Sequence, residues 1–281
     1  MMWLQLPFHG LDPVFLRLGP LELRWYGLMY MFGFIAAFLV MRRAIRSRNI
    51  GLSVEDLYDL LFYLILGVMI GGRLGYIVLY DLSEYLMNPA AIFAIWRGGM
   101  SFHGGFLGTT VAAMLVVRKR GWSFGQIADL CAIAAPIGLG LGRLGNFING
   151  ELYGRPTTLP WAMIFPGGGD LGRHPSQIYE ALLEGLVLFL FVGWVYRRAL
   201  KPGSAAWALI AGYGVVRLLV EFVREPDAHL GLDLGPLTRG QVLTLPMIII
   251  GGYFLLRAYR APVRVSAARS DRPARRRPPS T

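Results

Sequence analysis

A polar segment directly follows an apolar one in the middle of the chain. Residues 131–141 read CAIAAPIGLGL, a composition typical of a membrane-spanning helix, and residues 142–155 read GRLGNFINGELYGR. Ionisable groups are costly inside a bilayer and usually mark a functional site there. The side chains that make the second segment polar are Arg143, Asn146, Asn149, Glu151 and Arg155.

The whole chain has the composition of a membrane protein. Of its 281 residues 55% are hydrophobic and 16% are charged, whereas about a quarter of a soluble domain is charged. The net charge of +11 does not indicate nucleic-acid binding, because the Lys and Arg clusters lie just beyond apolar runs and not along a soluble face. The single Cys131 lies within such a run, which excludes a disulfide framework and a cysteine-based metal site. We expect neither a metal nor a cofactor.

Seven apolar runs approach the length of about 20 residues that a spanning helix needs. They cover residues 26–44, 57–79, 100–117, 126–146, 177–196, 204–223 and 240–259. The predicted fold class is therefore all-α, a polytopic membrane protein with a bundle of seven transmembrane helices. Residues 1–260 would form one transmembrane domain, followed at 261–281 by a disordered basic tail that is rich in Arg, Pro and Ser.

Lys and Arg are distributed unequally over the connections between these runs. One side of the predicted bundle receives 18 of the 28 basic residues, including the tail, and the other side receives seven. The positive-inside rule then places the C-terminus in the cytoplasm and the N-terminus outside. On the outer side, residues 82–98 are expected to form an amphipathic interfacial helix, and residues 150–175 a small external cap.

Three arginines, Arg73, Arg143 and Arg217, fall inside the predicted spans. On insertion scales each costs about 2.5–3.5 kcal/mol near the bilayer centre, so we expect them to face the bundle interior and to pair with anionic groups. A purely structural pairing is the alternative, above all for Arg73. The carboxylates available for it are Asp129, Glu180, Glu184 and Glu221.

The sixth run, WALIAGYGVVRLLVEFVR at 207–224, carries a single polar stripe. Tyr213, Arg217, Glu221 and Arg224 follow at i, i+4, i+8 and i+11 and therefore share one helical face. A self-neutralising pair of Arg217 with Glu221 is possible, but it leaves the other two residues unexplained. The stripe predicts a polar cavity or a partner stripe within the bundle.

Arg143 and Asn146 stand one turn apart near the outer end of their helix. Arginine is suited to bidentate recognition of phosphate, so a lipid phosphate in the outer leaflet is a natural ligand at that depth. His103, in MSFHGGFLG, begins the third run at a similar expected depth and near the stripe of the sixth run. A neutral imidazole there could take a proton from a nucleophile; a hydrogen-bonded bystander is the alternative.

Six motifs together resemble those of the bacterial phosphatidylglycerol–prolipoprotein diacylglyceryl transferase family. They occur in order between about residues 7 and 260 and are RWYG at 24–27, HGG at 103–105, GRLGNFINGELYGR at 142–155, RHPSQIYE at 173–180, RLLVEFVR at 217–224 and GQVLTLPM at 240–247. The resemblance implies a multi-pass enzyme of the bacterial inner membrane with a periplasmic N-terminus and cap. It would transfer the diacylglyceryl group of phosphatidylglycerol to the lipobox cysteine thiol in the signal peptide of a prolipoprotein. A thioether would form and glycerol phosphate would leave, as the first step of lipoprotein maturation.

The resemblance also assigns roles to individual residues. Arg143 and Arg217 would hold the lipid phosphate, with Asn146 and Tyr26 positioning the head group. Glu151, which would orient Arg143 or Arg155, and Gly154 complete the implied substrate-binding set. The implied catalytic set is His103, Arg217, Glu221 and Tyr213. In it His103 is the candidate base, and Glu221 with Tyr213 is the alternative acid–base pair. The implied partners are phosphatidylglycerol, prolipoprotein signal peptides and membrane lipids, with no nucleic acid.

Two other classes of protein compete with this interpretation. A transporter of anions or lipid head groups would also line a path with Arg143 and Arg217, but the first, third and seventh runs have almost no polar residues in their inner halves. A structural scaffold held by small-residue contacts gives no reason for Tyr213, Arg217 and Glu221 to share a face.

Overall fold

The structure is a computed structural model and describes residues 6–8, 10–19, 21–48, 50–94, 98–198, 201–225, 232–234 and 237–260. The predicted tail at 261–281 lies outside the described residues. Most of the described chain is helical, and each of the seven predicted apolar runs coincides with a helix. These are α1 (Trp25–Arg48), α2 (Val54–Tyr80), α4 (Phe102–Arg120), α5 (Phe124–Asn149), the continuous helix of α6 (Ser176–Glu180), η3 (Ala181–Val187) and α7 (Leu188–Arg197), then α8 (Ser204–Val220) and α9 (Arg239–Arg260).

Five of these helices are long and apolar enough to cross a membrane: α1, α2, α5, the 176–197 helix and α9. The remaining two are α4 and α8, and α8 is apolar but has only 17 residues. The molecule is therefore a helical protein of the polytopic membrane class.

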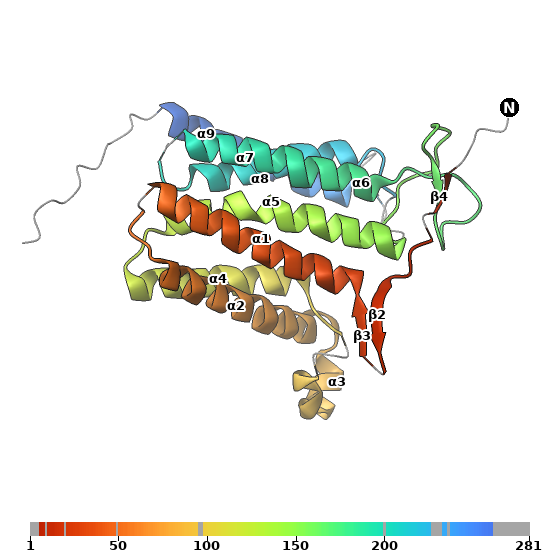
Figure 1. The fold of residues 1–281 in the computed structure, drawn as a ribbon, viewed down its shortest axis with the longest axis horizontal. Coiled ribbons are helices and arrows are strands. Elements are labelled where there is room, and N and C mark those ends of the chain that lie inside the picture. The colour runs from red at the N-terminus through yellow and green to blue at the C-terminus, as the bar shows by residue number, and fades with distance from the viewer. Residues whose placement is uncertain are drawn as a thin grey trace, which may run out of the picture.

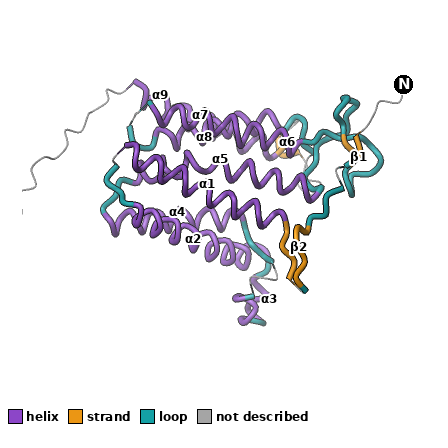
Figure 2. Tube along the Cα trace, in the orientation of Figure 1, coloured by secondary structure: helices purple, strands orange, loops and turns teal. Residues whose placement is uncertain are grey.

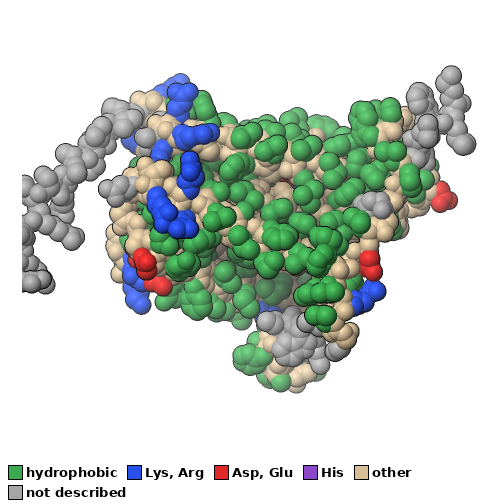
Figure 3. All heavy atoms as spheres, in the orientation of Figure 1, with side chains coloured by type: hydrophobic (Ala, Val, Ile, Leu, Met, Phe, Trp, Pro, Cys, Tyr) green, Lys and Arg blue, Asp and Glu red, His purple; other side chains and the backbone are tan. Residues whose placement is uncertain are grey.

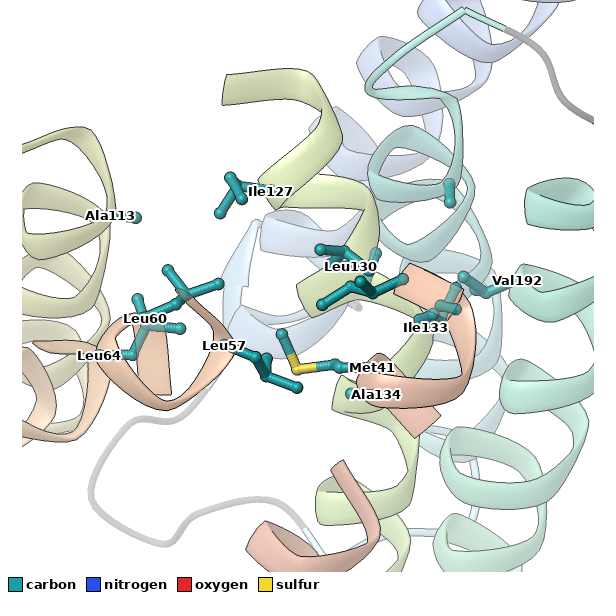
Figure 4. Close-up of a cluster of buried hydrophobic side chains, with 14 of the residues drawn as sticks. Met41, Leu57, Leu60, Leu64, Ala113, Ile127, Leu130, Ile133, Ala134 and Val192 are labelled. Atoms are coloured by element: carbon teal, nitrogen blue, oxygen red, sulfur yellow. The ribbon is translucent and has the colours of Figure 1, made fainter. Parts of the chain in front are cut away.

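The helices are arranged in layers (Figure 1). α1 packs on α5, α2 packs on α4, and α7, α8 and α9 form a third group that contacts α5 through α7 and α8. The core lies where these groups meet, with Met41 of α1, Leu57 and Leu60 of α2, Leu130 of α5 and Val192 of α7 among its fully buried side chains (Figure 4).

α2 and α4 approach so closely that only glycines fit between them. Gly67, Gly71 and Gly75 of α2 face Gly104 and Gly108 of α4. A Cβ on Gly71 would lie 2.4 Å from the Gly104 carbonyl oxygen, and one on Gly108 would lie 2.2 Å from that of Gly67. Small residues at this spacing let two membrane helices meet backbone to backbone.

Asp129 does not pair with any of the three arginines predicted inside the spans. Its carboxylate, on α5, accepts hydrogen bonds from the backbone N–H groups of Gly203 and Ala206, at 2.8 and 3.0 Å. These N–H groups belong to the first turn of α8, which has no side-chain cap of its own. A carboxylate is favourable at a helix N-terminus, so a buried charge of α5 caps a neighbouring helix.

Short strands lie at one end of the bundle (Figure 2). β2 (Val14–Leu18) and β3 (Leu21–Arg24) form an antiparallel hairpin that leads directly into α1, and β1 (Leu6–Pro7) pairs in parallel with β4 (Met163–Ile164) of the predicted cap. β5 (Leu232–Leu234) and β6 (Leu237–Thr238) pair before α9. The predicted helix at 82–98 is present in part, as α3 (Leu82–Met87) and the 3₁₀ turn η1 (Pro89–Phe93).

The surface separates apolar from basic side chains. Figure 3 shows hydrophobic side chains over the length of the bundle and Lys and Arg gathered at one end, where α1 and α9 end. Basic residues occupy the last turns of α1, α4, α7 and α9. The strands, α3 and the cap lie toward the opposite end (Figure 1).

Candidate active site

Arg143 points from α5 to two glutamates of the 176–197 helix. Its Nε lies 2.6 Å from Glu180 Oε2 and 3.2 Å from Glu184 Oε2. The two side chains are 1% and 0% exposed, and the Arg143 side chain is 17% exposed. Buried carboxylates need a paired cation, so these groups form one electrostatic unit.

Arg217 and Arg224 approach the same carboxylates from the other side. Arg217 Nη1 lies 3.8 Å from Glu180 and 3.9 Å from Glu184, and its Nη2 lies 3.0 Å from Glu221 Oε2. Arg224 Nη1 lies 3.7 Å from Glu180 Oε1. We call the resulting set the ion cluster: Arg143, Arg217, Arg224, Glu180, Glu184 and Glu221. Three positive and three negative charges balance within it.

The structure therefore brings the polar stripe of the sixth run to one place. α8 ends at Val220, three residues before the predicted end, and Glu221 is its C-cap residue. Arg224 lies beyond it, and its backbone forms a bridge with Gly154 of the cap. Tyr213, one turn before Arg217, is near enough to Glu184, Arg217 and Arg143 to interact with their charges. The partner stripe is the Glu180–Glu184 face of the 176–197 helix.

The end of β6 and the start of α9 close the cluster around Glu221. Thr238 Oγ1 donates a hydrogen bond of 2.9 Å to Glu221 Oε1, and Thr238 is 4% exposed. A Cβ on Gly240 would lie 2.7 Å from Glu221 Oε1. Any side chain at position 240 would push the Glu221 carboxylate from its present place. This contact explains the first residue of the GQVLTLPM motif.

Asn146 and Glu151 form a second polar group at the end of α5. Glu151 Oε1 accepts hydrogen bonds from the side-chain amides of Asn146 and Asn149, at 2.9 and 3.1 Å. These amides hold Glu151, whereas Arg143 pairs with Glu180 and Glu184 and Arg155 donates to the Arg224 carbonyl. That Glu151 orients Arg143 or Arg155 stays a prediction. Leu152 follows with a φ of +58°, an uncommon conformation for a side chain of its size that marks strain near a functional site.

Tyr26, at the start of α1, packs directly on α5. A Cβ on Gly145 would lie 2.7 Å from Tyr26 Cδ2, and the Tyr26 hydroxyl lies 3.2 Å from that of Tyr30. Glu151 and Arg143 both lie within electrostatic range of Tyr26. The structure thus brings Tyr26, Asn146 and Glu151 together beside Arg143.

Gly154 lies where three backbone segments meet. A Cβ there would lie 2.5 Å from the Val223 carbonyl oxygen and 2.7 Å from His174 Cβ. Its N–H donates to the His174 carbonyl at 2.9 Å. Gly154 contributes no side chain to the ion cluster; it allows the cap to join the segment that carries Arg224.

His103 lies elsewhere, in the first turn of α4. It is exposed and lines a groove of about 810 Å³ between α2 and α4 whose other lining residues are apolar except for Lys119 and Arg120 at the far end. α4 packs chiefly on α2. The contacts of the ion cluster come from α5, the 176–197 helix and the end of α8, and the structure does not bring His103 into them.

Arg73 departs from its expected role. The residue is 5% exposed, and its guanidinium donates to backbone carbonyls of the connection that follows α3. The expectation that Arg73 pairs with a carboxylate is therefore wrong, because its partners are carbonyl oxygens.

Glu180 and Glu184 are site residues that are absent from the predicted catalytic and substrate-binding sets. From the sequence they are expected only as possible counter-ions, and in the structure they are the anions that hold Arg143 and Arg217. Two glutamates four residues apart inside an apolar run were the available signal, because they face one side of a helix. Among the described residues, no group of three or more His, Cys, Asp or Glu could hold a metal ion.

Membrane-length helices around a buried cluster of arginines and glutamates define an integral membrane protein with a charge-balanced polar site between its helices. Residues 13–257 match the family described as prolipoprotein diacylglyceryl transferase. The chain belongs to that family.

The relatives agree over most of their length. The chain is 58% identical over 244 residues to the phosphatidylglycerol–prolipoprotein diacylglyceryl transferase of Geobacter sulfurreducens. The matched region covers 87% of this chain and 94% of the relative. It is 50% identical over 255 residues to that of Vibrio vulnificus, covering 91% and 94%. It is 49% identical over 261 residues to that of Bordetella bronchiseptica, covering 92% and 100%. The resemblance carried by the motifs is confirmed.

Proposed function

We propose that the chain transfers the diacylglyceryl group of phosphatidylglycerol to the lipobox cysteine of a prolipoprotein. The names of its relatives state for them a diacylglyceryl transfer between phosphatidylglycerol and a prolipoprotein. The carbon–oxygen bond between the glyceryl carbon and the phosphate breaks, and a carbon–sulfur bond forms. The thiol loses its proton, and glycerol phosphate leaves. The observation that carries the proposal is the ion cluster, which offers buried arginines to a phosphate that gains charge during the reaction.

The exposure of the cluster supports an approach of the phosphate to the arginines. The side chains of Arg143 and Arg217 are 17% and 14% exposed, whereas those of Glu180 and Glu184 are 1% and 0% exposed. An anionic ligand therefore meets guanidinium groups first, with the glutamates behind them. Charge-assisted contacts from arginine to phosphate are strong and geometrically specific. Tyr26, Asn146 and Glu151, beside Arg143, are in place to bind the rest of the head group.

We assign the base for the thiol to His103. Glu221, the alternative, already neutralises Arg217 at 3.0 Å and accepts from Thr238. Protonating Glu221 would remove the carboxylate nearest to the Arg217 guanidinium. His103 is exposed at the start of α4 and lines the groove between α2 and α4. The assignment requires the lipid phosphate and the thiol to meet between α4 and the ion cluster, with Tyr213 and Glu221 holding Arg217.

We further propose seven crossings of the bacterial inner membrane. α4 and α8, with 19 and 17 residues, have lengths of roughly 28 and 25 Å, close to the hydrocarbon thickness of about 30 Å. The basic end of the bundle in Figure 3 would face the cytoplasm, and the cap and the N-terminus the periplasm. A C-terminal fusion would then be fluorescent with green fluorescent protein and inactive with alkaline phosphatase; the reverse pattern would contradict the orientation.

The transfer itself tests the function. Purified protein would receive phosphatidylglycerol and a lipobox peptide, and mass spectrometry would follow the diacylglyceryl thioether and released glycerol phosphate. We expect product from the wild type and from Arg17→Gln, an exposed change in the β2–β3 hairpin, and none from Arg143→Ala. His103→Gln should bind lipid but lose nearly all turnover, keeping only a small residual rate. Folded wild-type protein that forms no thioether with any lipid would refute the proposal.

A further inference from the structure

The guanidinium of Arg73 donates hydrogen bonds to the backbone of the connection between α3 and α4. Its Nε donates to the Ile92 carbonyl at 2.9 Å, and its Nη1 donates to those of Gly98 and Gly99 at 2.6 and 3.0 Å. Its Nη2 donates to the carbonyls of Ala91 and Ala94 at 2.6 and 3.4 Å. A guanidinium has five N–H donors, and all five are occupied. Arg73 has no donor left for a lipid phosphate.

The connection is shaped to receive this side chain. Gly98 and Gly99 have φ values of +82° and +79°, in the left-handed region that favours glycine. Their carbonyl oxygens meet Arg73 Nη1, and a Cβ on Gly99 would lie 2.7 Å from the same nitrogen. Any other residue at position 99 would be strained and would displace the guanidinium.

The same part of α2 also holds the first residues of α4. The Ser101 N–H donates to the carbonyl of Gly72, next to Arg73, at 2.9 Å. Ser101 is the N-cap of α4, and its Oγ accepts from the Gly104 N–H at 3.3 Å. His103 lies between these two residues in the first turn. The position of His103 therefore depends on how firmly α2 holds the segment before it.

We propose that Arg73 is a positioning residue for His103. By fixing residues 91–94 and 98–99 against α2, it sets where α4 begins and where the imidazole lies. Lysine cannot replace it, because an ammonium has three donors and no planar fork. The inference rests on the proposed transfer reaction and on the role of His103 as its base.

The test compares Arg73→Lys and Gly99→Ala, which disturb the same contact from its two sides, with the exposed control Arg17→Lys. Transfer kinetics would be measured with phosphatidylglycerol and a lipobox peptide, and amide exchange would be followed at residues 98–105. We expect the two clamp variants to lose amide protection there. Their kcat should fall by roughly 10- to 100-fold, since a displacement of about 1 Å has such effects. KM for phosphatidylglycerol should stay unchanged.

A double-mutant cycle separates positioning from general damage to the fold. In a His103→Gln background Arg73→Lys should lower the residual rate no further, because residues that act through one another are not additive. The inference would be overturned if Arg73→Lys lowers the rate as much in the His103→Gln background as in the wild type, or if it raises KM with normal kcat. A normal kcat of Arg73→Lys, measured beside an active wild type, would overturn this inference and leave the proposed function standing. An inactive wild type would overturn the proposed function as well.

Discussion

Glu180 contacts all three arginines of the ion cluster, so its removal should be costly. Its oxygens lie 2.6, 3.8 and 3.7 Å from Arg143, Arg217 and Arg224, and its side chain is 1% exposed. Glu180→Gln keeps the shape but leaves the cluster with one net positive charge. Removing one partner of a buried ion pair typically costs about 3–5 kcal/mol.

The expected change is measurable as a shift in Tm. About 3 kcal/mol corresponds to a decrease of roughly 6–12 °C for a protein of this size class. Intrinsic fluorescence during heating would report it, since the chain contains seven tryptophans. A lipid phosphate replaces the missing negative charge, so phosphatidylglycerol should raise the Tm of Glu180→Gln more than that of the wild type. Neutral phosphatidylcholine micelles are the reference.

The matched control is Glu22→Gln in β3. Glu22 pairs with Arg24 at 2.9 Å, but both side chains are exposed, and such surface pairs contribute about 0–1 kcal/mol. Its Tm should stay near that of the wild type. If Glu180→Gln unfolds at the wild-type temperature, or if phosphatidylglycerol stabilises both proteins equally, the ion cluster is not the charge-balanced site described above.

Three further outcomes are expected. Gly154→Ala should lower the free energy of unfolding by about 1–3 kcal/mol through overpacking. It should also reduce transfer, because its Cβ would press on Val223 and His174 and displace Arg224. Unchanged activity and Tm would show that the cap adapts. Asp129→Ala removes the cap of α8 and should lower the stability by about 0.5–2 kcal/mol. The Tm would report this loss, and KM for lipid should stay unchanged. A change in KM at constant Tm would count against a purely structural cap. His174 in the cap lies partly buried, which lowers its pKa below the ordinary value of 6.5. The unfolded chain therefore binds the proton more readily, and stability should be fully present above that value and decline as the pH falls through it. His174→Gln should lose this dependence in a pH series of melting curves, and a wild type without any decline would contradict it.

The sequence predicted the helices because their signal is local. Each apolar run is a helix in the structure. The stripe of Tyr213, Arg217 and Glu221 faces Glu180 and Glu184 of the 176–197 helix. The end of α8 was placed three residues too late because Glu221 and Arg224 keep a helical spacing although the helix stops at Val220. That stop depends on the bridge between Arg224 and Gly154, a contact between distant parts of the chain.

The partners of buried charges were harder to predict than their presence. Intramembrane position predicts an anionic partner for Arg73, and Asp129 is one of the carboxylates available for such a pair. Backbone groups satisfy both residues instead: carbonyls for Arg73 and N–H groups for Asp129. Irregular backbone has no signature in composition or periodicity. Backbone partners of a buried charge therefore cannot be predicted from the sequence, whereas side chains of opposite charge can. The separation of His103 from the ion cluster is likewise a matter of helix packing, which the depth of a residue along its helix does not fix.

The order of residues along the chain gives the ion cluster a consequence for biosynthesis. Arg143 is made before Glu180 and Glu184, so α5 reaches the membrane with a charge whose counter-ions are still about 40 residues away in the nascent chain. An unpaired arginine costs about 2.5–3.5 kcal/mol at that stage. α5 and the 176–197 helix are thus expected to leave the insertion machinery together as one helical hairpin. A ribosome stalled before Glu180 would leave α5 poorly anchored in the bilayer.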